Sequence, residues 1–306
     1  MTKICILGPS KRGQEEVWLI EEAQKLFDKV AYVPIASTRV VSIAKGVDVL
    51  YKNTSLSEFD AILPRIPRTR KNYGYVVSKI LAGKTLIPFK PESVFITHNK
   101  FLTLVALDRA KIPIPKTYLA STRKALERLL DKIEYPIVIK LLYGSLGTGV
   151  MFAETKQSAV PLMDTIEGLK EPVFVEEFIK NPGEDIRVLV IGDEVAAAMK
   201  RIAQHGDRRT NIGAGGSGKK IKLSAEMESL AISTAKALKL GIAGIDIIEG
   251  KDGPVVIEAN INAHFSEITR VTGINVAQRM VQYMKDKLDA RKKVLTGGFW
   301  DLVEGY

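Results

Sequence analysis

The fold is decided by one stretch near the C-terminal end, Gly244-Ile245-Asp246-Ile247-Ile248-Glu249-Gly250-Lys251-Asp252-Gly253-Pro254-Val255-Val256-Ile257-Glu258-Ala259-Asn260. Two apolar runs flank a turn rich in glycine and aspartate, a pattern that predicts an antiparallel hairpin. If the turn centres on Asp252, pairing sets Asp246 opposite Glu258, and the two-residue period puts Asn260 on that same face. The hairpin therefore brings three oxygen ligands together.

This convergence of oxygen ligands predicts a metal site. Facing carboxylates in an apolar hairpin repel one another and destabilise the sheet unless a cation lies between them. Oxygen ligands of this type suit Mg²⁺ or Mn²⁺, with water and nucleotide phosphates completing the coordination shell. The alternative is a solvated hairpin with two surface acids, against which the apolar neighbours of both acids argue.

Composition limits the classes of function. The 306 residues are 46% hydrophobic and 26% charged, as in an ordinary folded protein of about two domains. The net charge of +10 favours an anionic partner, which is a nucleic acid, a nucleotide or an acidic acceptor molecule. The basic clusters of the chain are not interleaved with stacking aromatic residues, so nucleic acid binding is not expected.

The single cysteine and the absence of a long apolar run exclude other classes. Cys5 cannot form an intrachain disulfide or a cysteine-based zinc site. No apolar stretch reaches the roughly 20 residues that span a bilayer, and the chain starts at once with a strand-like run. We therefore expect a cytoplasmic protein that does not enter a membrane.

The pattern along the chain predicts three folded units and a tail. Residues 3–7, 30–35 and 59–63 read as strands around a helix at 15–27, which is typical of a small α/β unit. A break at residues 88–91 precedes a second unit, which has a helix at 99–111 and strands at 136–140, 150–153 and 173–179. A third unit follows, with a helix at 224–240, the hairpin and a closing helix at 276–288. The predicted boundaries are 1–94, 95–180, 181–288 and, for a tail without clear periodicity, 289–306.

The glycine-rich run Gly144-Ser145-Leu146-Gly147-Thr148-Gly149 lies between two predicted strands. A Walker loop or a Rossmann fingerprint would instead open into a helix, so neither motif is present. Its backbone N–H groups are suited to phosphates, although a plain turn explains the run about as well. Lys140, at the end of the preceding strand, favours the phosphate interpretation. Lys100 would supply a second cation; alone it reads as a solvated helix residue.

A second polar stretch contains Arg201, Arg209, Thr210 and Asn211, followed by more glycines. Guanidinium groups suit phosphate or carboxylate, but a basic surface loop explains these residues equally well. The three histidines are too dispersed for a zinc cluster, and no hydrolytic triad is evident.

Taken in order, these segments resemble an ATP-grasp ligase, and most closely the RimK-like amino-acid ligases. The resemblance covers the chain from Met1 to about Leu288. It implies a fold of mixed α/β and α+β class, in which an N-terminal Rossmann-like domain precedes two α+β units that hold ATP between their sheets.

The resemblance also implies a role for each matching residue. Those expected to contact the phosphates or to cover them are Lys100, Lys140, Gly144, Ser145, Gly147, Thr148 and Gly149. Those expected to border the rest of the nucleotide are Glu176, Glu177, Phe178 and Ile179, with Asp185 on the ribose. Those expected at the γ-phosphate or the acyl phosphate are Arg201, Arg209, Thr210 and Asn211. Two Mg²⁺ or Mn²⁺ ions would be held by Asp246, Glu258 and Asn260.

In this chemistry ATP phosphorylates a carboxylate and an amino acid then attacks the acyl phosphate, so no protein nucleophile is needed. We expect L-glutamate as the added amino acid and an anionic acceptor: a ribosomal-protein tail, an amino-group carrier protein, or a polyglutamylated deazaflavin or pterin coenzyme. Relatives commonly follow the metal asparagine with a Ser-Pro-Gly turn, whereas this chain has Asn262-Ala263-His264-Phe265, so its substrate pocket differs. The resemblance also implies a dimer or tetramer.

Two hypotheses from other classes remain. The altered turn after Asn260 is compatible with a nucleotide-gated protein that binds ATP without turnover. Net charge alone would suit an RNA-binding protein, whose affinity would survive Asp246→Ala.

Overall fold

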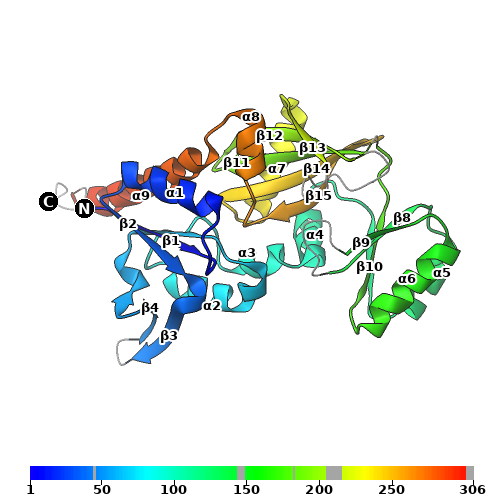
Figure 1. Cartoon of the computed structure of the whole chain (residues 1–306), viewed down its shortest axis with the longest axis horizontal. Helices are drawn as coiled ribbons and strands as arrows, with labels where there is room; N and C mark the ends of the chain where they lie inside the picture. The colour runs from blue at the N-terminus through cyan, green and yellow to red at the C-terminus, as the bar shows by residue number, and fades with distance from the viewer. Residues whose placement is uncertain (44–45, 143–148, 182, 205–215, 301–306) are drawn as a thin grey trace.

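The computed structural model describes residues 1–43, 46–142, 149–181, 183–204 and 216–300. Three groups of elements follow one another along the chain, and the colours of Figure 1 run through them from blue at the N-terminus to red at the C-terminus. Each group is built on its own β-sheet.

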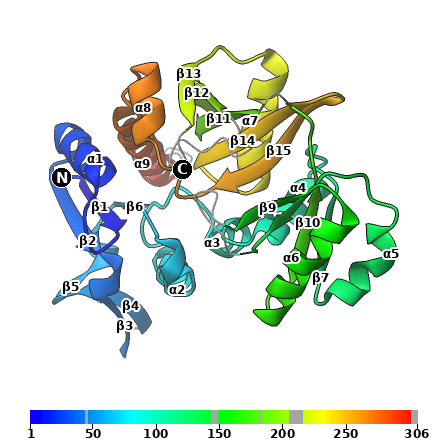
Figure 2. The ribbon, with the colours of Figure 1, turned by 45° about the vertical axis from the view of Figure 1, so that its right-hand side comes forward.

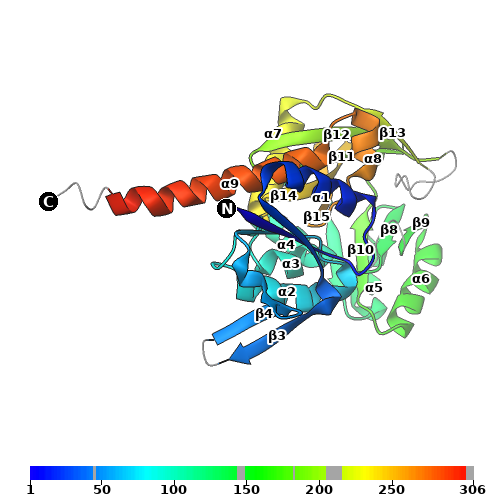
Figure 3. The same cartoon turned by 60° about the vertical axis from the view of Figure 1, so that its left-hand side comes forward.

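The N-terminal group contains a parallel sheet with the strand order β2-β1-β6. Strand β1 has no exposed side-chain surface at Ile4, Cys5 and Ile6, as expected for a parallel strand covered on both faces. A small antiparallel sheet projects from this group (Figure 3). The elements are β1 (Lys3–Gly8), α1 (Gln14–Leu26), β2 (Lys29–Pro34), η1 (Ile35–Ser37), β3 (Thr38–Ile43), β4 (Gly46–Tyr51), β5 (Thr54–Ser55), η2 (Leu56–Glu58), β6 (Ala61–Pro64), η3 (Arg68–Arg70), α2 (Lys71–Leu81) and α3 (Glu92–Thr97).

The central group is an antiparallel sheet with the order β7-β10-β8-β9, and α6 packs on it through the buried Ala159, Met163 and Ile166. Figure 2 shows its helices α5 and α6 on the side away from the C-terminal sheet. The elements are α4 (Lys100–Arg109), β7 (Thr117–Ala120), η4 (Arg123–Leu126), α5 (Glu127–Leu130), β8 (Ile137–Lys140), β9 (Val150–Ala153), α6 (Lys156–Gly168) and β10 (Val173–Glu177).

The C-terminal group is a five-stranded antiparallel sheet with the order β13-β12-β11-β14-β15. Side chains alternate along β11, so that Val188 and Val190 join the core with α7 whereas Leu189 and Ile191 face α8 and α9. The elements are β11 (Glu184–Ile191), β12 (Glu194–Ile202), β13 (Ser217–Lys220), α7 (Ala225–Ala237), β14 (Ile242–Gly250), β15 (Gly253–Asn260), α8 (Ser266–Thr272) and α9 (Val276–Trp300).

One core joins the first group to the last. Leu19 and Ala23 of α1 pack with Met280 and Met284 of α9, in a cluster that also includes residues of β1, β6, β11 and β12. The N-terminal sheet is therefore fixed to the C-terminal sheet through α1 and α9.

Two expectations about the elements need correction. The segment after residue 288, for which we expected a tail without periodicity, continues as helix α9 to Trp300. Strand β10 ends at Glu177, two residues earlier than expected. The domain boundaries stay a prediction. Within the described residues, no helix is both long enough and apolar enough to cross a membrane.

Candidate active site

The β14–β15 hairpin sets Asp246 opposite Glu258 and Gly244 opposite Asn260, as predicted. The turn, however, is one residue tighter than expected, because Gly250 pairs with Gly253 and Ile247 with Val256. Between Val256 and Glu258 the register shifts, which leaves Ile257 as a β-bulge. The bulge keeps Val256 in the apolar core while Glu258 lies across from Asp246, on the opposite face.

Asp246 lies between two arginines. Arg187 Nε is 2.5 Å from Asp246 Oδ1, and Arg201 Nη2 is 3.1 Å from Asp246 Oδ2. Arg201 is itself held by Asp185, which accepts two hydrogen bonds of 2.6 Å from its guanidinium. Although burial opposes the charged form, Asp246 and Asp185 raise the pKa of Arg201 above its usual value, so it stays charged.

These ion pairs correct part of our argument for a metal. We expected the facing carboxylates to need a cation between them, but Arg187 and Arg201 already neutralise Asp246. Charge balance alone therefore does not require a divalent ion. Asp185, for which we expected a ribose contact, has both oxygens engaged by Arg201.

Lys100 reaches Glu258 from another element. Its Nζ is 3.1 Å from Glu258 Oε1, and the side chain of Asn99 caps α4 by accepting hydrogen bonds from the N–H groups of Phe101 and Leu102. The cap starts the helix at Lys100. Burial raises the pKa of Glu258, but Lys100, then Arg187 and Lys140, outweigh it and hold that pKa well below its ordinary value.

Lys140 ends strand β8 and forms an ion pair with Glu176 of the neighbouring strand β10. Both side chains are largely buried. Lys100, Lys140, Glu176 and Glu258 line one narrow pocket between the central and C-terminal sheets. The structure thus brings Glu258 close to Lys100 and Lys140, both of which precede it by more than a hundred residues in the sequence.

The end of β10 and the residues after it contact the central group and the hairpin turn. The N–H of Glu177 donates to the carbonyl of Lys116 at 2.9 Å, and its side chain accepts from the N–H of Lys116 at 2.8 Å. The ring of Phe178 meets that of Phe152 edge to face at 6.0 Å. Ile179 borders the hairpin turn near Gly250.

Gly149 begins the return strand with a φ of +79°, where an added Cβ would lie 2.8 Å from the Leu141 side chain. The remaining expected residues, Gly144, Ser145, Gly147, Thr148, Arg209, Thr210 and Asn211, lie outside the described part of the chain.

A larger cavity of about 650 Å³ opens on the other side of Glu258, against the N-terminal group. Glu258 lines both pockets, so it stands at their junction. Residues from three sources form the walls of the large cavity: Lys11 and Glu15 before and in α1, Arg68 and His98 around α2 and α3, and Arg187, Arg201, Asn260, Asn262 and His264 from the C-terminal group.

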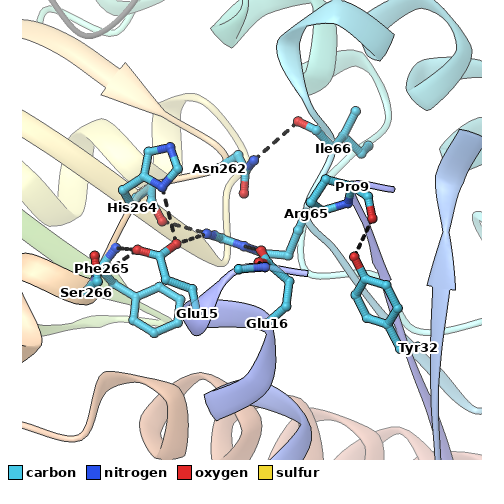
Figure 4. Close-up of polar contacts among 12 residues, drawn as sticks. Pro9, Glu15, Glu16, Tyr32, Arg65, Ile66, Asn262, His264, Phe265 and Ser266 are labelled. Atoms are coloured by element: carbon cyan, nitrogen blue, oxygen red, sulfur yellow. Dashed lines mark hydrogen bonds and ion pairs between the residues drawn. The ribbon is translucent and has the colours of Figure 1, made fainter. Parts of the chain in front are cut away.

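A buried network fixes the wall that contains His264 (Figure 4). The Glu15 carboxylate accepts hydrogen bonds from the N–H groups of Phe265 at 2.6 Å and Ser266 at 2.8 Å, and from Arg65 Nη2 at 2.5 Å. Arg65 in turn donates to the carbonyl of Ala263 at 3.0 Å, and its guanidinium lies over the Phe265 ring. The segment 262–265, which departs from the pattern of the family, is therefore held by the N-terminal group.

Three residues in this site were missed by the sequence reasoning. Arg187 shares a face of β11 with Asp185, and this i, i+2 spacing of opposite charges was the available signal. Glu15 and Arg65 lie fifty residues apart, and they contact a segment about 250 and 200 residues away respectively, so no local pattern marks them.

Comparisons with known proteins identify the family of this chain. A family model described as the RimK-like ATP-grasp domain matches residues 97–284. A probable alpha-L-glutamate ligase of Nitrosococcus oceani is 33% identical over 300 residues, covering 97% of this chain and 99% of that protein. A probable alpha-L-glutamate ligase 2 of Shewanella denitrificans is 40% identical over 243 residues, covering 78% and 80%.

Solved structures share the fold. The RimK domain protein ATP-grasp from Sphaerobacter thermophilus superposes with a TM-score of 0.71 at 23% identity, covering 92% of this chain and 99% of that one. The ATP-grasp ligase PsnB, complexed with a phosphomimetic variant of its minimal precursor, Mg and ADP, gives 0.72 at 21%, covering 96% and 99%. The mixed α/β and α+β architecture is thus the ATP-grasp fold, as expected, and the chain belongs to the RimK-like ATP-grasp family.

Proposed function

We propose that the chain joins the amine of L-glutamate to a carboxylate of an anionic acceptor, with ATP converted to ADP and phosphate. The family and the names of its relatives make the chain an ATP-dependent amino-acid ligase. The observation that carries the finer proposal is the convergence of Lys100, Lys140 and Glu258 where the narrow pocket meets the large cavity.

Lys100 and Lys140 would bind the phosphates of ATP. Each lysine is already beside a carboxylate, Glu258 or Glu176, so its ammonium is positioned before the nucleotide arrives. Fixed cations that need no reorganisation stabilise the charge that develops on a transferring phosphoryl group. Glu177, Phe178 and Ile179 would border the adenine, and the glycine run 144–149 would cover the phosphates.

The proposed metal ligands are Asp246, Glu258 and Asn260. We propose that they hold two Mg²⁺ or Mn²⁺ ions. Their carboxylate and amide oxygens are the donors these ions prefer. PsnB was solved with Mg and ADP. A bound ion would supply Lewis-acid stabilisation of the phosphoryl oxygens.

The large cavity would receive the acceptor carboxylate and the amino acid. Arg201, fixed by Asp185 and Asp246, would face the acyl phosphate from the cavity wall. We assign Asp185 to holding this arginine, since a ribose contact would compete with its two hydrogen bonds. Attack of the amine on the acyl carbon forms the C–N bond and releases phosphate. Arg209, Thr210 and Asn211 remain proposed contacts of the same group.

The acceptor carries several negative charges in this proposal, in keeping with the net charge of +10. A ribosomal-protein tail, an amino-group carrier protein and a polyglutamylated deazaflavin or pterin coenzyme all meet that condition. Its assembly into a dimer or tetramer stays a prediction.

The test is ADP release from Mg-ATP with pooled L-amino acids and these acceptors, followed by mass spectrometry of each acceptor. A mass increase of one glutamate residue supports the proposal, and omission of single amino acids identifies the substrate. ADP release that does not depend on an amino acid refutes it. As a control, Lys236→Ala changes an exposed side chain of α7, and this variant should form ADP as fast as the unchanged chain.

A further inference from the structure

His264 is the most exposed polar side chain in the network of Figure 4. Its side chain is 71% exposed, and it lines the large cavity that also contains Glu258 and Asn260. One ring nitrogen, Nδ1, lies 3.3 Å from Glu15 Oε2. Figure 4 shows the other nitrogen on the side of the ring away from Glu15. The imidazole is therefore anchored at one nitrogen and open at the other.

The anchor is rigid because Glu15 has a second task. Helix α8 starts at Ser266 without a side-chain cap of its own, and the Glu15 carboxylate fills that position by binding the N–H groups of Phe265 and Ser266. Burial raises the pKa of Glu15, but His264, Arg65 and Ser266 outweigh it and lower that pKa to about 2. Glu15 is thus ionised at neutral pH and fixes both α8 and the ring.

An ionised carboxylate only accepts hydrogen bonds, so Nδ1 of His264 carries the proton of this contact. A second carboxylate at Nε2 would place the ring between two negative charges. Donation from Nε2 as well as Nδ1 requires the doubly protonated ring, in which both nitrogens carry a proton.

The other charges of the cavity are mostly engaged elsewhere. Arg65 is bound to Glu15 and Glu16, Arg201 to Asp185, and Glu258 to Lys100. Glu267 and Lys11 also line the cavity, and Lys11 forms no ion pair with a described residue. His264 therefore offers an anchored ring with a nitrogen available to a ligand.

Resting on the proposed function, we propose that His264 determines specificity by donating from Nε2 to a substrate carboxylate that does not react, while Glu15 orients the ring. This carboxylate comes from the amino acid or from the acceptor.

Steady-state kinetics separate the two sources. For the wild type, His264→Ala, His264→Gln and Lys236→Ala, KM and kcat are measured for L-glutamate, for L-glutamine and for a peptide ending in two glutamates. We expect His264→Ala to raise KM for one carboxylate-bearing substrate about 10- to 100-fold, with kcat within about threefold. His264→Gln keeps a donor and recovers part of the loss. If glutamate is the substrate affected, its advantage over glutamine falls by the same factor.

Equilibrium binding makes this inference independent of turnover. Calorimetry with L-glutamate and with the peptide, on protein loaded with Mg²⁺ and a non-hydrolysable ATP analogue, should show weaker binding of one probe to His264→Gln and unchanged binding to Lys236→Ala. A histidine-dependent affinity without any turnover refutes the proposed ligase reaction and leaves this inference standing. Equal affinities and equal KM values in His264→Gln and the wild type overturn the proposed role of His264. An equal loss of affinity for ATP and for every other substrate overturns it as well.

Discussion

Glu258 is the residue at which the two halves of the site meet. It lines both pockets, pairs with Lys100 from α4 and lies opposite Asp246 on the hairpin. Its side chain is 37% exposed, so the ion pair with Lys100 contributes little to stability, about 1 kcal/mol or less. Its carboxylate is therefore more important for chemistry than for folding.

Glu258→Gln is expected to lower kcat/KM for ADP formation about 10²- to 10³-fold, since it removes the charge of a proposed metal ligand and of the partner of Lys100. The free energy of unfolding should change by about 1 kcal/mol or less. ADP release and urea unfolding measure the two quantities. Glu249→Gln, an exposed residue of the same hairpin, should change neither. A large loss of stability in Glu258→Gln would make the residue structural instead.

Glu15 links stability to pH. Its pKa is lowered from 4.5 to about 2 on folding, so the folded state binds its proton less readily than the unfolded chain does. The stabilisation is fully present above pH 4.5 and is lost as the pH falls from there toward 2. A shift of this size corresponds to roughly 3 kcal/mol. Glu15→Gln should therefore be less stable than the wild type at pH 7, and the difference should shrink by pH 3.

Urea unfolding at pH 7, 5, 4 and 3 measures this dependence. Glu21→Gln, an exposed position on the same helix, should follow the wild-type curve at every pH. A constant difference between Glu15→Gln and the wild type down to pH 3 would show that the Glu15 charge does not stabilise the fold.

At the scale of elements, the hairpin shows what sequence reasoning reaches and what it misses. Period-two alternation and the turn residues sufficed to pair Asp246 with Glu258. The prediction assumed a turn centred on Asp252, however, whereas the structure combines a tighter turn with a bulge at Ile257. A bulge depends on packing of the neighbouring strand and helices, so the residues of the hairpin alone do not mark it.

The ion pairs of the site were harder to predict from the sequence for a related reason. Lys140 was recognised from its position at the end of a strand and Lys100 from the family resemblance, but their partners Glu176 and Glu258 lie on other elements. Likewise, the sequence assigned no role to Arg187, because its contact with Asp246 depends on the register of β11 against β14. Register across a sheet is a tertiary property.

Gly244 tests how closely β14 packs against the segment after β15. An added Cβ would lie 2.5 Å from the Ala263 Cβ and 3.3 Å from Arg187 Nη1. Gly244→Ala should therefore destabilise the protein by about 1–3 kcal/mol and lower ligase activity, since Arg187 must move. Thermal unfolding and ADP release measure both effects. Gly168→Ala in α6, where the new Cβ meets no atom within 4 Å, should leave both unchanged or slightly raise stability.

At the scale of the whole molecule, the N-terminal group and the C-terminal sheet share one core through α1 and α9. The sequence indicated separate folded units because each has its own run of strands. It gave no sign that their faces pack together, since apolar periodicity marks which side of a helix is buried and not against what. Likewise, residues 289–300 lack regular apolar spacing and include two glycines, so apolar spacing did not predict that α9 continues beyond Leu288.

Truncation distinguishes the part of α9 that holds the molecule together from the part that does not. Leu288 is the last α9 residue in the shared core, and beyond it the contacts include Arg291 Nη2 to the carbonyl of Gly83 at 2.8 Å and Lys292 Nζ to Asp60 at 3.2 Å. Removal of residues 289–306 should therefore lower the free energy of unfolding by about 2 kcal/mol or less, because these contacts lie near the surface. Removal of residues 276–306 exposes the core and should prevent folding.

Circular dichroism, urea unfolding and ADP release on both truncated chains measure these outcomes. The shorter truncation should keep its cooperative transition and its activity, because no residue proposed for the site lies beyond Asn275. If it instead lost cooperativity, the contacts of Arg291 and Lys292 would hold the N-terminal sheet in place. If it kept its fold but lost activity, residues 289–306 would reach the site or an assembly on which the site depends.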